Sequence, residues 1–376
     1  MHLTVSQGDD LLREMRFDAD PGRYSAFEAD GELSVTDGRV RWSPPNNGGS
    51  LRWQVAIPNR RHGDGYDAWL DESWGLFRAE DIIPRAATRT LIGVAIETSI
   101  EFILPGKWSA VTEYANRDGR FRVIKAGRRF AQPSGWIVLG DLGVRRERIA
   151  GTRVAVAAPE NQGVRRMDIL ALLNWTLPEL RRIVPEMPPR LTVVSAGNPM
   201  WRGGLSAPQS IYIHADRPLI SENGTSTLLH EVVHVALGAS AEGDYDWIVE
   251  GLAEFYSLQL LQRSGSITPA SYERALQRQL EWASSAQALC GQSSTGETTA
   301  LAVTVFATLD REIRDGSGGD RSLDDVVSKL LETSAPLSLE SLRAISADLL
   351  GEKSDALHID NLPGCRTIAA DSNSST

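Results

Sequence analysis

The 376-residue sequence has little of several features that mark particular classes of protein. Cysteine is scarce: Cys290 and Cys365 permit one disulfide but do not require it, and two unpaired thiols fit the sequence equally well. Long apolar runs are missing, because the longest candidate, Thr298 to Leu309, suits a buried core helix better than a membrane span. We therefore expect no integral membrane segment.

Positive charge is also in deficit. The chain carries 39 Lys and Arg against 49 Asp and Glu, a formal net charge of −10, which argues against nucleic acid or an anionic membrane as the main partner. The start, Met1 to Asp10, has neither a basic region nor an apolar core and does not predict a signal peptide. We expect a soluble protein that is cytoplasmic or, if a leader is missing from this sequence, periplasmic or exported.

What the sequence does contain is His230-Glu231-Val-Val-His234. Two histidines four residues apart lie about 400° apart around a helix axis, so both imidazoles leave one face and can share a metal ion. Glu231 lies about 100° from His230, where a carboxylate can take a proton from water activated by the metal. The neighbouring positions are apolar and uncharged, unlike those of a surface helix, and Gly238 is placed to end the helix.

A third ligand is needed, since a catalytic zinc usually has three protein ligands and one open position. Glu250 follows His234 by sixteen residues, enough for a turn and a second helix to return antiparallel. Glu254 is one turn further and could accept the free N–H of a zinc-bound imidazole. Gly251 would let the two helices approach closely. In the alternative interpretation, both glutamates are exposed acids on an amphipathic helix, but their neighbours are apolar.

The N-terminal part, residues 1 to 160, is predicted to be β-rich and sandwich-like. Asp37-Gly38 between two alternating runs indicates a hairpin over residues 33–42. Further short strands are predicted, separated by Gly, Pro, Asn and Asp, over residues 51–57, 99–104, 121–124, 136–139 and 153–157.

The rest of the chain is predicted to be an α+β zinc-binding subdomain over 161 to 264 and a helical C-terminal subdomain over 265 to 376, whose tail is disordered. In the former we expect a helix over 167–184, kinked or divided at Pro178, and strands over 190–195 and 210–214. Apolar spacing predicts the remaining helices, over residues 247–263, 269–289, 298–314, 323–332 and 339–350. The fold class is therefore α+β and multidomain.

These motifs resemble the gluzincin zinc metallopeptidases. His230 to His234 followed by Trp247-Ile-Val-Glu-Gly-Leu-Ala-Glu-Phe-Tyr256 is most similar to the glycyl aminopeptidase-like family, whose members often carry a PDZ domain, which we do not expect here. Leu309 to Val327, and more weakly Asp67 to Leu70 and Trp74 to Asp81, extend the similarity. The resemblance implies one Zn²⁺ bound by His230, His234 and Glu250, with Glu231 as general base.

The sequence departs from that family at two places. Ser206, in Gly203-Gly204-Leu205-Ser206, stands where the family has a Glu that holds a substrate's amino terminus. Thr299 stands near the place of a Tyr that stabilises the oxyanion, and nothing in the spacing selects a replacement among Tyr245, Tyr272 and His358. His214, in a predicted strand, is more readily a structural or surface histidine than a residue of the cleft.

The function we predict is zinc-dependent peptide hydrolysis, with Glu231 as base and an extended peptide or unfolded chain bound along the edge strand Gly203-Gly204-Leu205. The substitutions at Ser206 and Thr299 leave a second hypothesis, a peptide-binding or scaffold protein that keeps zinc with weak or no turnover. A purely structural zinc site would require a fourth ligand, and the sequence offers none nearby.

Overall fold

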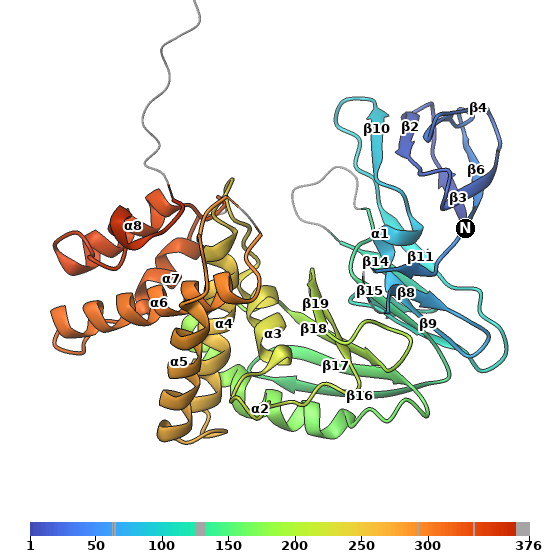
Figure 1. Ribbon diagram of the computed structural model, residues 1–376. Helices are drawn as coiled ribbons and strands as arrows, with labels where there is room; N and C mark the ends of the chain where they lie inside the picture. The colour runs from blue at the N-terminus through green and yellow to red at the C-terminus, as the bar shows by residue number, and fades with distance from the viewer. Residues whose placement is uncertain (62, 64, 125–131, 292, 334, 366–376) are drawn as a thin grey trace, which may run out of the picture.

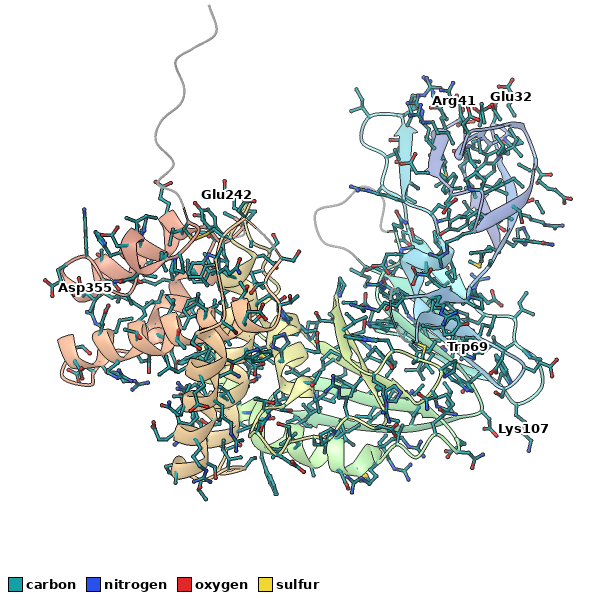
Figure 2. All side chains as sticks on the ribbon, viewed as in Figure 1. Glu32, Arg41, Trp69, Lys107, Glu242 and Asp355 are labelled. Carbon is teal, nitrogen blue, oxygen red and sulfur yellow. A yellow bond between two sulfur atoms is a disulfide. The ribbon has the colours of Figure 1, made fainter. Side chains whose placement is uncertain are left out.

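The computed structural model describes residues 1–61, 63, 65–124, 132–291, 293–333 and 335–365. Its β-rich N-terminal part and its helical C-terminal part lie at opposite ends of the molecule, with a small sheet between them (Figure 1). The side chains labelled in Figure 2 mark the two ends: Glu32 and Arg41 lie on the β-rich part, Glu242 and Asp355 on the helical part. This is the expected α+β multidomain fold.

A small two-sheet sandwich opens the chain. One sheet has the order β1-β6-β3 and the other β10-β2-β5-β4. Alternating side chains from both sheets, among them Phe17, Trp42 and Trp53, share one core. The hairpin predicted at Asp37-Gly38 joins β4 to β5. The strands are β1 (His2–Ser6), β2 (Leu12–Asp18), β3 (Tyr24–Ala29), β4 (Glu32–Thr36), β5 (Arg39–Ser43), β6 (Gly48–Val55) and β10 (Ala86–Thr90).

Two further sheets connect this sandwich to the rest of the molecule. Their orders are β12-β15-β9-β8-β7 and β11-β14-β13. The first contributes Trp74, Leu76, Trp136 and Val138 to a core that it shares with the central sheet. The elements are β7 (Asn59–Arg60), β8 (Tyr66–Leu70), β9 (Trp74–Arg78), the short helix α1 (Ala79–Ile82), β11 (Thr98–Glu101), β12 (Ser109–Val111), β13 (Ala115–Arg117), β14 (Arg120–Val123) and β15 (Trp136–Gly140).

The central five-stranded sheet, in the order β16-β17-β18-β20-β19, positions the candidate site. Strands β17, β18 and β20 are parallel, and β19 is an edge strand antiparallel to β20. One face packs on the sheet that contains β9 and β15, and the other packs on helices α2 and α3. The strands are β16 (Leu142–Ile149), β17 (Thr152–Pro159), β18 (Arg190–Ala196), β19 (Gly204–Ala207) and β20 (Ser210–His214). Strands β16 and β17 thus lie in the central sheet although they precede residue 160. The division of the chain into parts 1–160, 161–264 and 265–376 stays a prediction.

The helices largely follow the predicted ranges. They are α2 (Arg166–Ile183), α3 (Thr227–Leu237), α4 (Asp246–Arg263), α5 (Pro269–Ala283), α6 (Glu297–Gly316), α7 (Leu323–Leu331), α8 (Leu339–Leu350) and the 3₁₀ turn η1 (Ile359–Asn361). Pro178 does not divide α2, which continues to Ile183 with buried leucines on both sides of the proline. Helix α5 ends at Ala283, earlier than predicted, because the chain turns at Ser284 towards Cys290. In the described part of the chain, none of these helices has the length and apolarity of a bilayer span.

Cys290 and Cys365 form a disulfide, which decides between the two states that the sequence left open. The bond joins the segment after α5 to the end of the described chain, 75 residues later. The backbone supports the same junction, since the N–H of Leu289 donates to the carbonyl of Pro363 at 2.7 Å. The disulfide therefore closes a covalent loop that contains α6, α7 and α8.

Candidate metal centre

Helix α3 carries the two histidines. The Ser226 side chain caps its first turn by accepting from the N–H of Leu229, and Gly238 ends it with a positive φ of 55°, as the sequence predicts. Leu228, Leu229, Val232 and Val233 face the core. The remaining face presents the imidazoles of His230 and His234, whose ring centres are 4.7 Å apart. Burial of the apolar stripe thus turns both histidines towards α4.

Helix α4 is buried on nearly all sides and brings Glu250 back to these histidines. The Nε2 atoms of His230 and His234 are 3.0 Å apart, and the Glu250 carboxylate oxygens lie 3.3 Å from the first and 3.4 Å from the second. Ligand atoms bound about 2.0–2.1 Å from a tetrahedral zinc lie about 3.3–3.4 Å from one another. The three side chains therefore fit a zinc ion, and no other group of His, Cys, Asp or Glu in the described chain converges in this way.

Glu254 orients His230. Its Oε2 lies 3.0 Å from Nδ1 of His230. A carboxylate only accepts, so the ring proton is on Nδ1 and Nε2 is left to bind a metal. Gln279 of α5, a residue that the sequence did not single out, donates at 3.4 Å to Oε1 of the same carboxylate. Its buried position on a third helix could not be inferred from its spacing to the His-Glu motif.

The electrostatics of the cluster favour a cation. Burial lowers the pKa of His230, but hydrogen bonds to Glu250 and Glu254 outweigh it and raise the pKa to about 10. Burial raises the pKa of Glu250, while hydrogen bonds from His230 and His234 lower it to about 2. Glu231 adds a third carboxylate, and it too raises the pKa of His230. Three carboxylates around two imidazoles leave a negative field that a divalent cation would neutralise.

Glu231 is buried between α3 and the edge strand β19. A Cβ on Gly204 would lie 3.0 Å from Cγ of Glu231 and 2.7 Å from Cγ2 of Thr227. The N–H of His214 donates to the carbonyl of Gly203, which fixes the hydrogen-bonding register of the pair. Since backbone groups alternate along an antiparallel strand, the N–H and C=O of Gly204 and Ser206 face the outer edge, which pairs with no strand in the described part of the chain.

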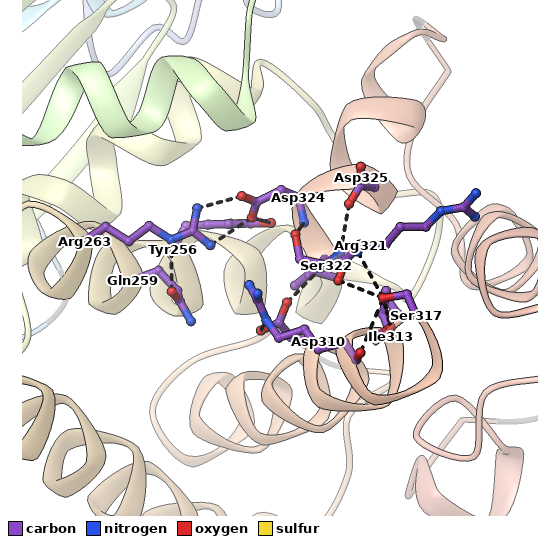
Figure 3. Close-up of polar contacts among 12 residues, drawn as sticks. Tyr256, Gln259, Arg263, Asp310, Ile313, Ser317, Arg321, Ser322, Asp324 and Asp325 are labelled. Atoms are coloured by element: carbon purple, nitrogen blue, oxygen red, sulfur yellow. Dashed lines mark hydrogen bonds and ion pairs between the residues drawn. The ribbon is translucent and has the colours of Figure 1, made fainter. Parts of the chain in front are cut away.

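The rear of α4 is held by a polar network (Figure 3). Arg263 donates to both carboxylate oxygens of Asp324 on α7, at 2.6 and 3.0 Å, and the hydroxyl of Tyr256 donates to the same carboxylate at 3.1 Å. Asp310 of α6 accepts from the N–H of Leu323 at 2.8 Å. These contacts fix the start of α7 against α4 and α6, and with it the helix that carries Glu250.

The other residues singled out in the sequence lie in separate places. Gly251 does not lie at the contact between α3 and α4. A Cβ there would lie 2.5 Å from Cβ of Ala302, so this glycine instead allows α6 to approach α4 closely. The prediction about Gly251 was wrong because a residue next to Glu250 points about 100° away from it on a helix. His214 is completely buried, as expected for a structural residue.

Among the proposed oxyanion donors, the Tyr272 hydroxyl accepts at 2.6 Å from Gln259. Gln259 lies on α4, more than two turns after Glu250. Tyr245 and His358 line a separate hollow beside α8. Thr299 bonds to Ser294, whose N–H donates to Asp246 at the start of α4. The hydroxyls of Tyr272 and Thr299 are thus bonded to groups outside the ligand cluster.

Comparisons with known proteins agree with this architecture. An aminopeptidase N family protein from Idiomarina loihiensis superposes with a TM-score of 0.67 at 17% identity, over 88% of this chain and 67% of that chain. An M1 zinc metallopeptidase from Deinococcus radiodurans gives 0.54 at 17% identity, over 93% and 86%. A two-domain M1 zinc metallopeptidase bound to L-arginine gives 0.55 at 16% identity, over 93% and 86%. This chain has the fold of the M1 zinc metallopeptidases.

Sequence comparison adds no closer relationship. No family profile matches the chain, and no curated protein is similar to it in sequence. The likeness therefore concerns fold, in agreement with the predicted gluzincin-type architecture. The closer resemblance to the glycyl aminopeptidase-like family stays a prediction.

Proposed function

We propose that this protein is a zinc-dependent metallopeptidase, with His230, His234 and Glu250 as ligands of one zinc ion and Glu231 as general base. The observation that carries the proposal is the spacing of the three ligand atoms, 3.0 to 3.4 Å, beside a buried glutamate and an open strand edge. Bound zinc would polarise the scissile carbonyl and lower the pKa of its water towards about 7.

Residues of the chain orient the metal ligand, transfer the proton and bind the substrate. Glu254 holds His230 in the tautomer that exposes Nε2. A carboxylate oxygen of Glu231 takes the proton of the attacking water and delivers it to the leaving amine. An extended peptide pairs with the outer edge of β19 through the backbone groups of Gly204 and Ser206, next to Gly203 and Leu205. Glycine at 204 lets the strand lie close enough to Glu231 for this geometry.

The strand edge supports peptide as the substrate class, since main-chain hydrogen bonding recognises any extended segment. The edge strand is also held by β15, because the carbonyl of Leu205 accepts from the indole N–H of Trp136 at 3.0 Å. Ser206 offers no anion for a substrate's ammonium group. We therefore propose peptide hydrolysis without assigning a preference for amino termini.

The test is hydrolysis of a mixed peptide library by the zinc-loaded protein, read out by mass spectrometry. We expect Glu231→Gln to lose turnover while keeping zinc, because the amide cannot accept the proton. Glu242→Gln, an exposed glutamate on the loop before α4, is the matched control and should cleave like the wild type. Equal product release by the wild type and Glu231→Gln would reject the peptidase proposal.

The second candidate is a zinc-containing peptide-binding protein with weak or no turnover. It is favoured by Thr299, whose hydroxyl is bonded to Ser294 where an oxyanion donor is expected. The same library distinguishes the two candidates. Peptides retained by the zinc-loaded protein but recovered uncleaved would support binding alone, whereas cleaved products absent from Glu231→Gln would exclude it.

A further inference from the structure

A row of arginines crosses three strands of the central sheet, away from the metal centre. In the strand register Arg148 of β16 lies opposite Arg153 of β17, and Arg153 lies beside Arg190 of β18. Arg146, two residues before Arg148, projects from the same face of β16. The four side chains therefore form one cationic surface, which we call the arginine row.

No ion pair within the described chain joins a carboxylate to the arginine row. The 21 ion pairs found there involve other cationic residues: arginines in fifteen of them, histidines in five and Lys329 in one. Glu147 points to the opposite face of β16, where it accepts from Asn174 of α2 at 3.1 Å.

Like charges directly opposite one another on neighbouring strands destabilise a sheet. Burial, and then the neighbouring charge of Arg153, lower the pKa of Arg190. A protein with a net charge of −10 does not need four unpaired arginines here for solubility. An anion bound among the four guanidinium groups would offset their mutual repulsion.

The arginine row lines a hollow of about 530 Å³ between the central sheet and the sheet of β13 and β14. Tyr114 and Phe121, both largely buried, line the opposite wall together with the polar Asn116, and Glu147 is the one acidic residue of the lining. Thr192 of β18, which also lines the hollow, donates at 3.4 Å to the carbonyl of Thr112 in the connection between β12 and β13. A space of this volume accommodates a small organic molecule.

The hollow is distinct from the candidate metal centre. Gly204, which contacts Glu231, is level with Ile213 of β20 and Ser195 of β18. Arg190 is five residues earlier on β18, roughly 16 Å along the strand at about 3.3 Å per residue. A ligand in the hollow would therefore not touch the metal ligands.

We propose that the hollow binds a small molecule with a doubly charged oxyanion head, a phosphate monoester, on an apolar or aromatic body. The guanidinium forks of Arg153 and Arg190 match the oxygens of such a head, and Arg146 and Arg148 add charge at the rim. Tyr114 and Phe121 would contact the apolar body. The arginine row on one wall and the aromatic side chains on the other together favour a phosphate monoester with an apolar body over an anion without one.

The test uses phenyl phosphate as the probe and titration calorimetry at low salt. We expect saturable binding tighter than about 1 mM, weaker binding of inorganic phosphate, which has no apolar body, and none of benzyl alcohol, which has no charge. Raising the salt concentration should weaken the binding of phenyl phosphate. Absence of saturable binding, or equal affinity for inorganic phosphate, would overturn the proposal.

Two variants locate the site. Arg153→Gln and Arg190→Gln should each weaken the binding of phenyl phosphate roughly tenfold or more. Arg145→Gln is the matched control: it removes the same charge from the next position of β16, which projects from the opposite face. Equal weakening by Arg145→Gln would show a general charge effect and reject the site.

Thermal unfolding gives an independent readout. A structural role and a binding role of the arginine row predict opposite changes in the melting temperature of Arg153→Gln without ligand. Without ligand, Arg153→Gln removes the central member of a like-charge row, so its melting temperature should equal or exceed that of the wild type. Phenyl phosphate should raise the melting temperature of the wild type and leave that of Arg153→Gln unchanged. A lowered melting temperature of Arg153→Gln without ligand would show that the arginine row stabilises the fold.

Discussion

Gly204 of the edge strand β19 lies against Glu231 of helix α3. The space at Gly204 is too small for a methyl group, since a Cβ there would lie within 3.0 Å of Thr227, Ile213 and Glu231. The edge strand and the proposed general base are thus held in one fixed relationship, which relates the proposed place of substrate binding to the proposed place of proton transfer.

Gly204→Ala should therefore impair catalysis more than binding of zinc. The added methyl group must displace β19 or Glu231, and small displacements of reacting groups cost rate steeply, so we expect kcat/KM to fall roughly tenfold or more. Zinc content should stay at the wild-type value. Gly8→Ala, where a Cβ meets nothing within 4 Å, is the control and should behave as wild type. Full activity of Gly204→Ala would contradict the proposed place of the substrate.

Glu254→Ala should weaken zinc binding without removing a ligand. Loss of the carboxylate that fixes Nδ1 of His230 leaves the imidazole free to rotate, and such partners typically contribute about 10–100-fold to metal affinity. Competition with a chromophoric chelator would measure the change. Glu273→Ala on the exposed face of α5 removes the same charge and should keep the wild-type affinity. Unchanged affinity in Glu254→Ala would mean that the 3.0 Å contact does not orient His230.

Asp324→Asn should destabilise the helical part. It leaves the partly buried guanidinium of Arg263, 19% exposed, without its carboxylate, at a cost of roughly 2–3 kcal/mol in the free energy of unfolding. Denaturant unfolding followed by circular dichroism would measure it. Asp348→Asn breaks the exposed pair with Lys329 and should cost less than about 1 kcal/mol. Similar costs for the two variants would show that the Arg263 network does not anchor α4.

Reduction of the Cys290–Cys365 disulfide should lower the stability of the wild type. Opening a loop of 75 residues restores chain entropy to the unfolded state, worth up to about 4 kcal/mol in the loop-entropy account. The denaturation midpoint should fall in reductant to that of Cys290→Ser, which should not respond to reductant. A wild-type midpoint independent of reductant would contradict a stabilising bond.

The convergence of His230, His234 and Glu250 could be predicted from the sequence, and the reason is periodicity. His230 and His234 had to share a helix face, and sixteen residues sufficed for Glu250 to return to them; the structure has both features. The spacing of Asp37-Gly38 likewise predicted the β4–β5 hairpin. Local patterns of this kind are encoded within a few residues, so they can be read without knowing what packs against them.

Contacts between distant segments could not be inferred in the same way. Gln279 reaches Glu254 from α5, and Arg148, Arg153 and Arg190 become neighbours only through strand register. The contact of Gly251 with α6 depends on packing that its neighbours in sequence do not reveal. The disulfide was undecided for the same reason, because 75 residues separate its cysteines.

The central claim is that His230, His234 and Glu250 hold one zinc ion, and metal analysis of the purified protein tests it most directly. We predict about one equivalent of zinc per chain in the wild type and almost none in His230→Ala, because the loss of one of three ligands opens the site. Less than about half an equivalent in the wild type, unchanged by His230→Ala, would contradict the claim.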